Sequence, residues 1–151
     1  KISGTYVNSI LAKTEAVLAG FDEAIMLNQD GSISEGTGEN LFLISDGALI
    51  TPPLGDNNLS GITRDSVFVL AENELGLKVQ EQHISRSELY LGDEVFLTGT
   101  AAHITPVGYL DNRPIGNGEV GPVTTKLREI YSEAVRGNHP KYLSWCTAVP
   151  N

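Results

Sequence analysis

The chain of 151 residues is 40% hydrophobic and 19% charged, which allows one domain with a sizeable core. Its 10 Lys and Arg against 19 Asp and Glu give a net charge of -9, which repels phosphate backbones and argues against nucleic acid as a partner. No apolar run reaches the roughly 20 residues of a membrane span, and the single Cys146 excludes an internal disulfide. We therefore expect a cytoplasmic protein without a zinc-type metal site, unless a targeting segment was removed upstream.

The first part of the chain predicts one helix followed by short strands. Apolar residues recur at helical spacing over residues 5–20, and Gly20 is typical of a helix end. Strands are expected at residues 23–27, 40–44 and 48–51, and the pair Asp46-Gly47 between the last two is typical of a hairpin turn. Residues 52–58 are then expected to form a surface loop.

The second part predicts two more helices with strands between them. One helix is expected to begin near Ser60 or Gly61, with Ser60 as its N-cap, and to end at Leu75. The expected strands cover residues 78–82, 94–98 and 104–110, and the last helix covers residues 122–135. No repeat or linker divides residues 1–151, so we expect one α/β domain. The order of strands in the sheet does not follow from this pattern.

Three loops rich in small residues lie beside predicted element ends, at residues 34–40, 59–64 and 97–102. Loops of this kind let the backbone approach a ligand closely. The second loop is chemically the most suggestive, because unpaired amides at a helix start attract an anion and Thr63 adds a hydroxyl. Each feature alone is more typical of ordinary structure: a capped helix, a tight turn, or a turn carboxylate in the case of Glu35. The functional interpretation therefore depends on their combination.

In combination these motifs resemble the class IV aminotransferases, which include branched-chain aminotransferases, D-amino-acid aminotransferases and aminodeoxychorismate lyase. The family signature is E-x-T-x-x-N-L-F, then an aliphatic-x-T, then L-x-G-I-x-R. The residues that match it are Glu35, Thr37, Asn40, Leu41, Phe42, Leu49, Thr51, Leu59, Gly61, Ile62 and Arg64. The first six residues, from Lys1 to Tyr6, are similar to the family's K-x-x-G-x-Y segment. Residues 99–107 and 121–124 are similar to the branched-chain subgroup.

The resemblance implies a fold and a reaction. The fold is the large C-terminal pseudo-barrel domain of the D-amino-acid aminotransferase-like class, fold type IV of the pyridoxal-phosphate enzymes, over residues 1–151. The reaction is transfer of the amino group of leucine, isoleucine or valine to 2-oxoglutarate through a Schiff base of pyridoxal 5'-phosphate. The partners implied are amino acids, 2-oxo acids, a smaller N-terminal domain of the same enzyme and a second copy in a homodimer or higher homo-oligomer.

Two alternatives stay open at this point. One is a D-amino-acid aminotransferase or aminodeoxychorismate lyase on the same fold. The other is a fragment or binding domain without turnover. His103 stands where the branched-chain subgroup usually has an acidic residue, which leaves fine substrate preference open, and residues 138–151 carry no motif and are expected to pack against a neighbouring surface.

The resemblance also implies roles for single residues. Lys1 is the expected catalytic residue, which binds the cofactor aldehyde and moves the proton at the substrate α-carbon. Glu35 is expected to bind the pyridine nitrogen, and Tyr6 the ring oxygen. The phosphate is expected on the amides of Ile62 and Thr63, where the hydroxyls of Thr63 and Thr100 add donors.

Further residues are expected to enclose the ring and the substrate. Leu59 is expected to press on one face of the ring. The residues expected to border the other face through their backbone are Gly38, Glu39 and Asn40. The turn expected to receive the substrate carboxylate comprises Thr100, Ala101 and Ala102.

Overall fold

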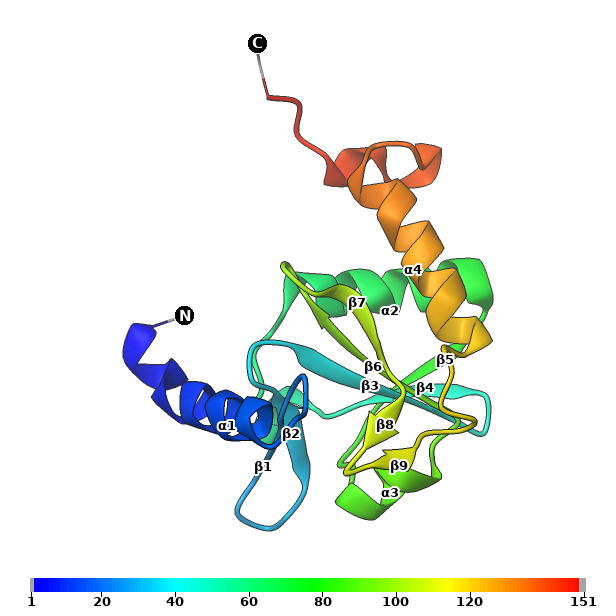
Figure 1. The fold of residues 1–151 in the computed structure, drawn as a ribbon. Coiled ribbons are helices and arrows are strands. Elements are labelled where there is room, and N and C mark those ends of the chain that lie inside the picture. The colour runs from blue at the N-terminus through cyan, green and yellow to red at the C-terminus, as the bar shows by residue number, and fades with distance from the viewer. Residues whose placement is uncertain (1, 150–151) are drawn as a thin grey trace.

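Five strands form the central sheet in the computed structural model of the chain, which describes residues 2–149 (Figure 1). In chain order they are β3 (Asn40–Ser45), β4 (Ala48–Thr51), β5 (Lys78–Glu81), β6 (Glu94–Gly99) and β7 (His103–Val107). Across the sheet the order is β5-β4-β3-β6-β7, and neighbours are antiparallel except β4 and β5, which are parallel. Strand β3 is therefore the central one, and its residues 40–44 are all buried.

Helices and two small hairpins surround this sheet. The α-helices are α1 (Val7–Leu18), α2 (Ile62–Leu75), α3 (Arg86–Leu91) and α4 (Pro122–Val135). The 3-10 helices are η1 (Ser3–Tyr6), η2 (Leu54–Asp56) and η3 (Pro140–Trp145). The hairpins pair β1 (Ile25–Leu27) with β2 (Ile33–Gly36) and β8 (Tyr109–Leu110) with β9 (Arg113–Pro114). Within the described residues, no helix has both the length and the apolar character to cross a membrane.

The two faces of the sheet carry separate apolar cores, because successive side chains of a strand point to opposite faces. On one face Phe42 of β3 stacks on Phe96 of β6 with their ring centroids 5.1 Å apart, and helices α2 and α4 cover both rings. On the other face Leu41 of β3 packs in a cluster with Leu89 of α3. The continuous apolar run at residues 41–44 thus results from burial on both faces.

Helix α1 lies at the margin of the domain, beside the β1-β2 hairpin (Figure 1). None of its residues is buried. Its apolar side chains Ile10, Leu11 and Leu18 are 60%, 64% and 84% exposed. The helix therefore presents an apolar surface that the described residues do not cover.

The sequence predicted most of these elements. The mixed α/β class is confirmed, and the helices over residues 61–75 and 122–135 are confirmed to within one residue. The strands at residues 40–44 and 48–51 are confirmed as β3 and β4. The first helix is shorter than expected, because residues 3–6 form the 3-10 helix η1 before α1 begins.

Some boundaries were wrong. Ser60 is not the N-cap of α2: that position is Gly61, which has no side chain to make a cap hydrogen bond. The strand expected over residues 104–110 is broken at Gly108, whose carbonyl accepts a hydrogen bond from the Ile115 amide at 2.9 Å as the chain turns into β8. Residues 33–36 overlap the loop expected at 34–40 but form β2, because they pair with β1.

Helix α3 and the short structure of the tail were missed. A capping box begins α3: the Ser85 hydroxyl accepts from the Glu88 amide at 3.3 Å, and the Glu88 carboxylate accepts from the Ser85 amide at 2.7 Å. The spacing of these two residues is a sequence signal that could have found this helix. In the tail, Tyr142 of η3 is buried in the core cluster of α2 and α4, so this segment packs on its own domain.

Candidate functional site

A hollow of about 250 Å³ lies where β2, β3, the start of α2 and the turn after β6 meet. The three loops singled out in the sequence all contribute to it, although they are far apart along the chain. The residues that line it are Tyr6, Glu35, Gly38, Glu39, Asn40, Leu59, Ser60, Gly61, Ile62, Thr63, Thr98, Gly99 and Thr100. The predicted site residues of these loops therefore come together in one place.

Three predicted site residues are not among those lining the hollow. Lys1 lies outside the described residues, so its position in the site stays a prediction. Ala101 and Ala102 follow Thr100 in the turn between β6 and β7. Within residues 2–149 no group of three or more His, Cys, Asp or Glu side chains could hold a metal ion.

The Glu35 carboxylate at the wall of the hollow is held by two N–H donors. The Asn40 side-chain amide donates to Glu35 Oε2 at 3.2 Å, and the Leu59 backbone amide donates to the same oxygen at 3.0 Å. Asn40 also donates to the Leu59 carbonyl at 2.7 Å. Asn40, which we expected to act through its backbone, therefore fixes both the acidic group and the loop before α2 through its side chain.

Gly61 allows this arrangement because its missing side chain leaves room for Asn40. A Cβ at Gly61 would collide with the Asn40 Oδ1 oxygen. The signature's asparagine and glycine are thus a packed pair, although β3 and α2 are separate elements. No such contact is needed at Gly38, where an added Cβ would meet nothing within 4 Å.

Arg64, another signature residue, fixes the start of α2 from below. Its side chain is 3% exposed, and its guanidinium donates to the Pro52 carbonyl at 3.1 Å and pairs with Glu81. The guanidinium also lies over the Phe68 ring, 4.6 Å from its centroid. Arg64 therefore ties the first turn of α2 to the loop after β4 and to β5.

Thr37, between the two strands that carry the acidic wall, binds a carboxylate behind the hollow. Its hydroxyl donates to Glu23 at 2.6 Å, and the Lys13 ammonium of α1 lies 2.6 Å from the other Glu23 oxygen. Burial alone raises the pKa of Glu23, but the hydrogen bonds from Lys13, Thr37 and the Ala24 amide outweigh it and hold this pKa below its ordinary value. The Glu23 cluster therefore joins α1 to the loop between β2 and β3.

Glu39, in the same loop, has the opposite electrostatic environment. Burial raises the pKa of its carboxyl, and the nearby charge of Glu23 adds to this effect, whereas the Gly38 amide bonded to it at 3.0 Å lowers it. The net result is a pKa above the ordinary value for glutamate. The wall of the hollow thus holds a carboxyl group that takes up a proton more readily than a surface glutamate does.

The start of α2 provides a niche for an anion. The N-cap Gly61 offers no side chain to the first amides of the helix, which by geometry lack partners within the helix. The Ile62 side chain is 85% exposed, whereas Thr63 is 5% exposed and its hydroxyl lies 3.4 Å from the hydroxyl of Tyr131 on α4. Unpaired amides, the helix dipole and a hydroxyl together suit a phosphate group.

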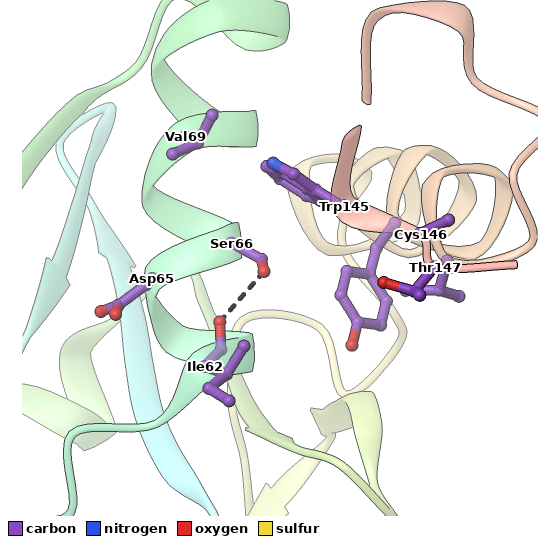
Figure 2. A pocket seen from close by; sticks show the side chains of 9 residues that line it. Ile62, Asp65, Ser66, Val69, Trp145, Cys146 and Thr147 are labelled. Atoms are coloured by element: carbon purple, nitrogen blue, oxygen red, sulfur yellow. Dashed lines mark hydrogen bonds between the residues drawn. The ribbon is translucent and has the colours of Figure 1, made fainter. Parts of the chain in front are cut away.

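A larger groove of about 590 Å³ lies on the outer side of the same helix, between α2 and the tail (Figure 2). Figure 2 shows Trp145, Cys146 and Thr147 facing Ser66 and Val69 across this groove. Apart from Ile62, none of the predicted site residues lines it. The smaller hollow is therefore the candidate site, because the signature residues converge there and not in the larger groove.

Sequence reasoning missed four residues that line the hollow as site residues. They are Ser60, Gly61, Thr98 and Gly99. Gly61 belongs to the family signature and Gly99 precedes Thr100, so their positions were available signals. Thr98 had no such signal, because a threonine inside a predicted strand is typical of any sheet.

The chain belongs to the class IV aminotransferase family, described as "Amino-transferase class IV", whose model matches residues 1–109. It is 56% identical over 149 residues to the probable branched-chain-amino-acid aminotransferase of Aquifex aeolicus, with 99% of this chain and 48% of that protein covered. It is 46% identical over 149 residues to the branched-chain-amino-acid aminotransferase of Pseudomonas aeruginosa, with the same shares covered.

Solved structures show the same likeness. A branched-chain amino acid aminotransferase from the source abbreviated T.th., complexed with N-(5'-phosphopyridoxyl)-L-glutamate, is 53% identical and superposes with a TM-score of 0.96 over 99% of this chain and 50% of that chain. The PLP form of the branched-chain amino acid aminotransferase of Thermobaculum terrenum is 45% identical, with a TM-score of 0.94 over 97% of this chain and 48% of that chain. The fold class implied by the sequence is thus confirmed, and the chain spans about half the length of the relatives it matches.

Proposed function

We propose that the full-length protein is a transaminase that moves the amino group of leucine, isoleucine or valine to 2-oxoglutarate with pyridoxal 5'-phosphate as cofactor. In this proposal residues 1–151 are the cofactor-bearing large domain of that enzyme. Relatives 45–56% identical are named as branched-chain-amino-acid aminotransferases. Two solved relatives carry pyridoxamine 5'-phosphate or a phosphopyridoxyl-glutamate adduct, which supports the choice of cofactor.

One observation carries the proposal: a fixed carboxylate and an open helix start line the same hollow. Glu35 is held by two N–H donors, and the first amides of α2 lack a side-chain cap. Pyridoxal phosphate has a basic ring nitrogen at one end and a phosphate dianion at the other, and these two features complement its two ends. The residues of the hollow therefore fit the cofactor.

Each lining residue then has a definite task. When bound, the cofactor supplies an aldehyde carbon for the amino group and a ring that withdraws electrons. Glu35 accepts the N–H of the ring nitrogen and so keeps that nitrogen protonated. Tyr6 donates its phenol hydrogen to the ring oxygen, and Leu59 packs on one face of the ring. The residues that border the other face are Gly38, Glu39 and Asn40.

At the phosphate end, the amides of Ile62 and Thr63 and the hydroxyls of Thr63 and Thr100 donate to the anion. Beyond Thr100, the amides of Ala101 and Ala102 receive the substrate carboxylate, for which small side chains leave room. These roles orient the substrate α-carbon toward the reacting end of the cofactor.

We assign Lys1 as the residue that binds the cofactor and moves the proton at the substrate α-carbon. An ordinary lysine amine has a pKa of about 10.4 and is a poor base at neutral pH. Its amine therefore needs desolvation or a cationic neighbour to act. Tyr6, at the end of the same segment, lines the hollow, which supports placing Lys1 beside it.

The rest of the polypeptide belongs to this proposal. The chain spans about half of its relatives, and α1 exposes an apolar face that the described residues leave uncovered. We propose that the smaller domain of the same enzyme covers this face and completes the side-chain pocket. A cytoplasmic location and a homo-oligomeric assembly are parts of the same proposal and rest on composition and on the family resemblance.

An assay of amino donors tests the proposal. Full-length protein loaded with pyridoxal phosphate should form glutamate from 2-oxoglutarate with L-leucine, L-isoleucine and L-valine, and none with D-alanine. Activity with D-alanine alone would favour a D-amino-acid aminotransferase on the same fold. Tight cofactor binding without activity toward any donor would favour a non-catalytic domain.

A further inference from the structure

Thr98, at the end of β6, has a buried hydroxyl without a hydrogen-bond partner in the described part of the chain. The residue is 1% exposed, and its Oγ1 atom is fully buried. A buried hydroxyl left unpaired is costly, so buried polar groups in native proteins nearly always find a partner. Thr98 also lines the candidate site. A bound ligand is therefore a natural partner for this hydroxyl.

The register of the sheet places Thr98 under the start of α2. Thr98 pairs with Asn40 across β3 and β6, and paired residues share a face of the sheet. Asn40 in turn contacts Gly61, the N-cap of α2, as the collision of a Cβ there demonstrates. Phe96, two residues before Thr98 on the same face, packs in the cluster covered by α2. The hydroxyl thus lies on the side of the hollow where the anion niche opens.

We infer that the Thr98 hydroxyl donates a hydrogen bond to the phosphate group held at the start of α2. This inference rests on the proposed function and adds a phosphate ligand that belongs to neither the α2 start nor the turn at Thr100. A hydroxyl has one hydrogen to donate, and a phosphate dianion offers only acceptors. Thr98 would thereby be satisfied when the cofactor is bound and unpaired when it is absent.

The variant Thr98→Val tests this inference, because valine keeps the shape and removes the hydroxyl. In the full-length protein we expect the Kd for pyridoxal 5'-phosphate, measured by absorbance titration, to rise by about tenfold. The Kd for pyridoxal, which lacks the phosphate, should change less than about twofold. The Tm of the cofactor-free variant should not fall, because the substitution removes an unpaired polar atom.

Thr124→Val is the matched control. Thr124 on α4 is also 1% exposed and its hydroxyl also has no partner in the described part of the chain, but it does not line the hollow. This variant should leave both affinities unchanged.

The outcomes separate the two proposals. If wild-type protein binds pyridoxal phosphate and Thr98→Val binds it equally well, the inference about Thr98 is overturned and the proposed function stands. Equal loss of affinity for pyridoxal phosphate and pyridoxal, or a lower Tm than Thr124→Val, would mean a structural role and would also overturn it. A wild-type protein that binds no pyridoxal phosphate would overturn the proposed function and the inference together.

Discussion

Asn40 joins the acidic wall of the site to the loop that leads into α2, since one side-chain amide serves both Glu35 and the Leu59 carbonyl. Asn40→Asp would replace this donor by an acceptor and place a second carboxylate beside Glu35. We expect a loss of about 2 kcal/mol in the free energy of unfolding, measured in urea, because buried groups lose partners and like charges meet. We also expect weaker cofactor binding.

Asn57→Asp is a suitable control for this variant. Asn57 donates to Asn28 at 2.8 Å in an exposed turn, with its own backbone in the left-handed region that aspartate tolerates. The change there should stay within about 0.5 kcal/mol. Equal effects at residues 40 and 57 would contradict the role given to Asn40.

Glu35→Gln tests the acidic end of the site by replacing the carboxylate with a neutral amide of the same shape. An amide cannot stabilise a protonated ring nitrogen as a carboxylate does. We expect kcat to fall by about 10²- to 10³-fold while the Kd for pyridoxal phosphate changes far less, because the phosphate niche is untouched. A loss of cofactor affinity as large as the loss of kcat would contradict this assignment.

At the scale of elements, Glu23 fastens α1 to the loop between β2 and β3, and this link depends on pH. Because the folded pKa of Glu23 is lowered, its contribution to stability is fully present above the unfolded pKa of about 4.3 and is lost as pH falls through the folded value. Glu23→Gln should lower the free energy of unfolding by about 1 kcal/mol at neutral pH, where the carboxylate accepts a buried hydrogen bond.

Urea unfolding of Glu23→Gln and wild type across the acidic range measures this effect. The difference between the two should shrink as pH falls below the unfolded pKa. Thr37→Val removes one donor to Glu23 and should move this loss to higher pH. Parallel stability curves at every pH would contradict the account.

The elements that periodicity predicted well are those buried by one sheet face or one helix stripe. Strands β3 and β4 and helix α4 match their patterns because their apolar residues meet the core directly. The short elements were missed, since β8 and β9 have two residues each and owe their shape to Gly108 and the turn that follows it. The six-residue helix α3 is too short for an apolar period, so only its capping box marks it.

The site divides in the same way. Glu35, Thr63 and Thr100 were predicted because a family signature or its flanking turn marks them. The role of the Asn40 side chain and the contact with Gly61 depend on the distance between two elements, which sequence spacing does not contain. Thr98 is a site residue through register alone, because pairing with Asn40 turns it to the side of the hollow.

At the scale of the whole molecule, α1 has an apolar face that requires a cover. Ile10 is 60% exposed in the described domain, so within this domain alone Ile10→Lys should cost little. In the full-length protein we expect a loss of about 1–3 kcal/mol in the free energy of unfolding, because the smaller domain buries this side chain. The control Glu15→Gln, on the exposed side of the same helix, should stay within about 0.5 kcal/mol. Indistinguishable values for the two variants would argue against a covered α1.

The central claim is that Lys1 and Glu35 converge on one bound pyridoxal phosphate. The most direct test is the absorption spectrum of the full-length protein with this cofactor, followed during addition of L-leucine. We expect an absorption band at the edge of the visible range, its loss when L-leucine is added, and its absence in Lys1→Ala. A band that L-leucine leaves unchanged, or one that persists in Lys1→Ala, would contradict the claim.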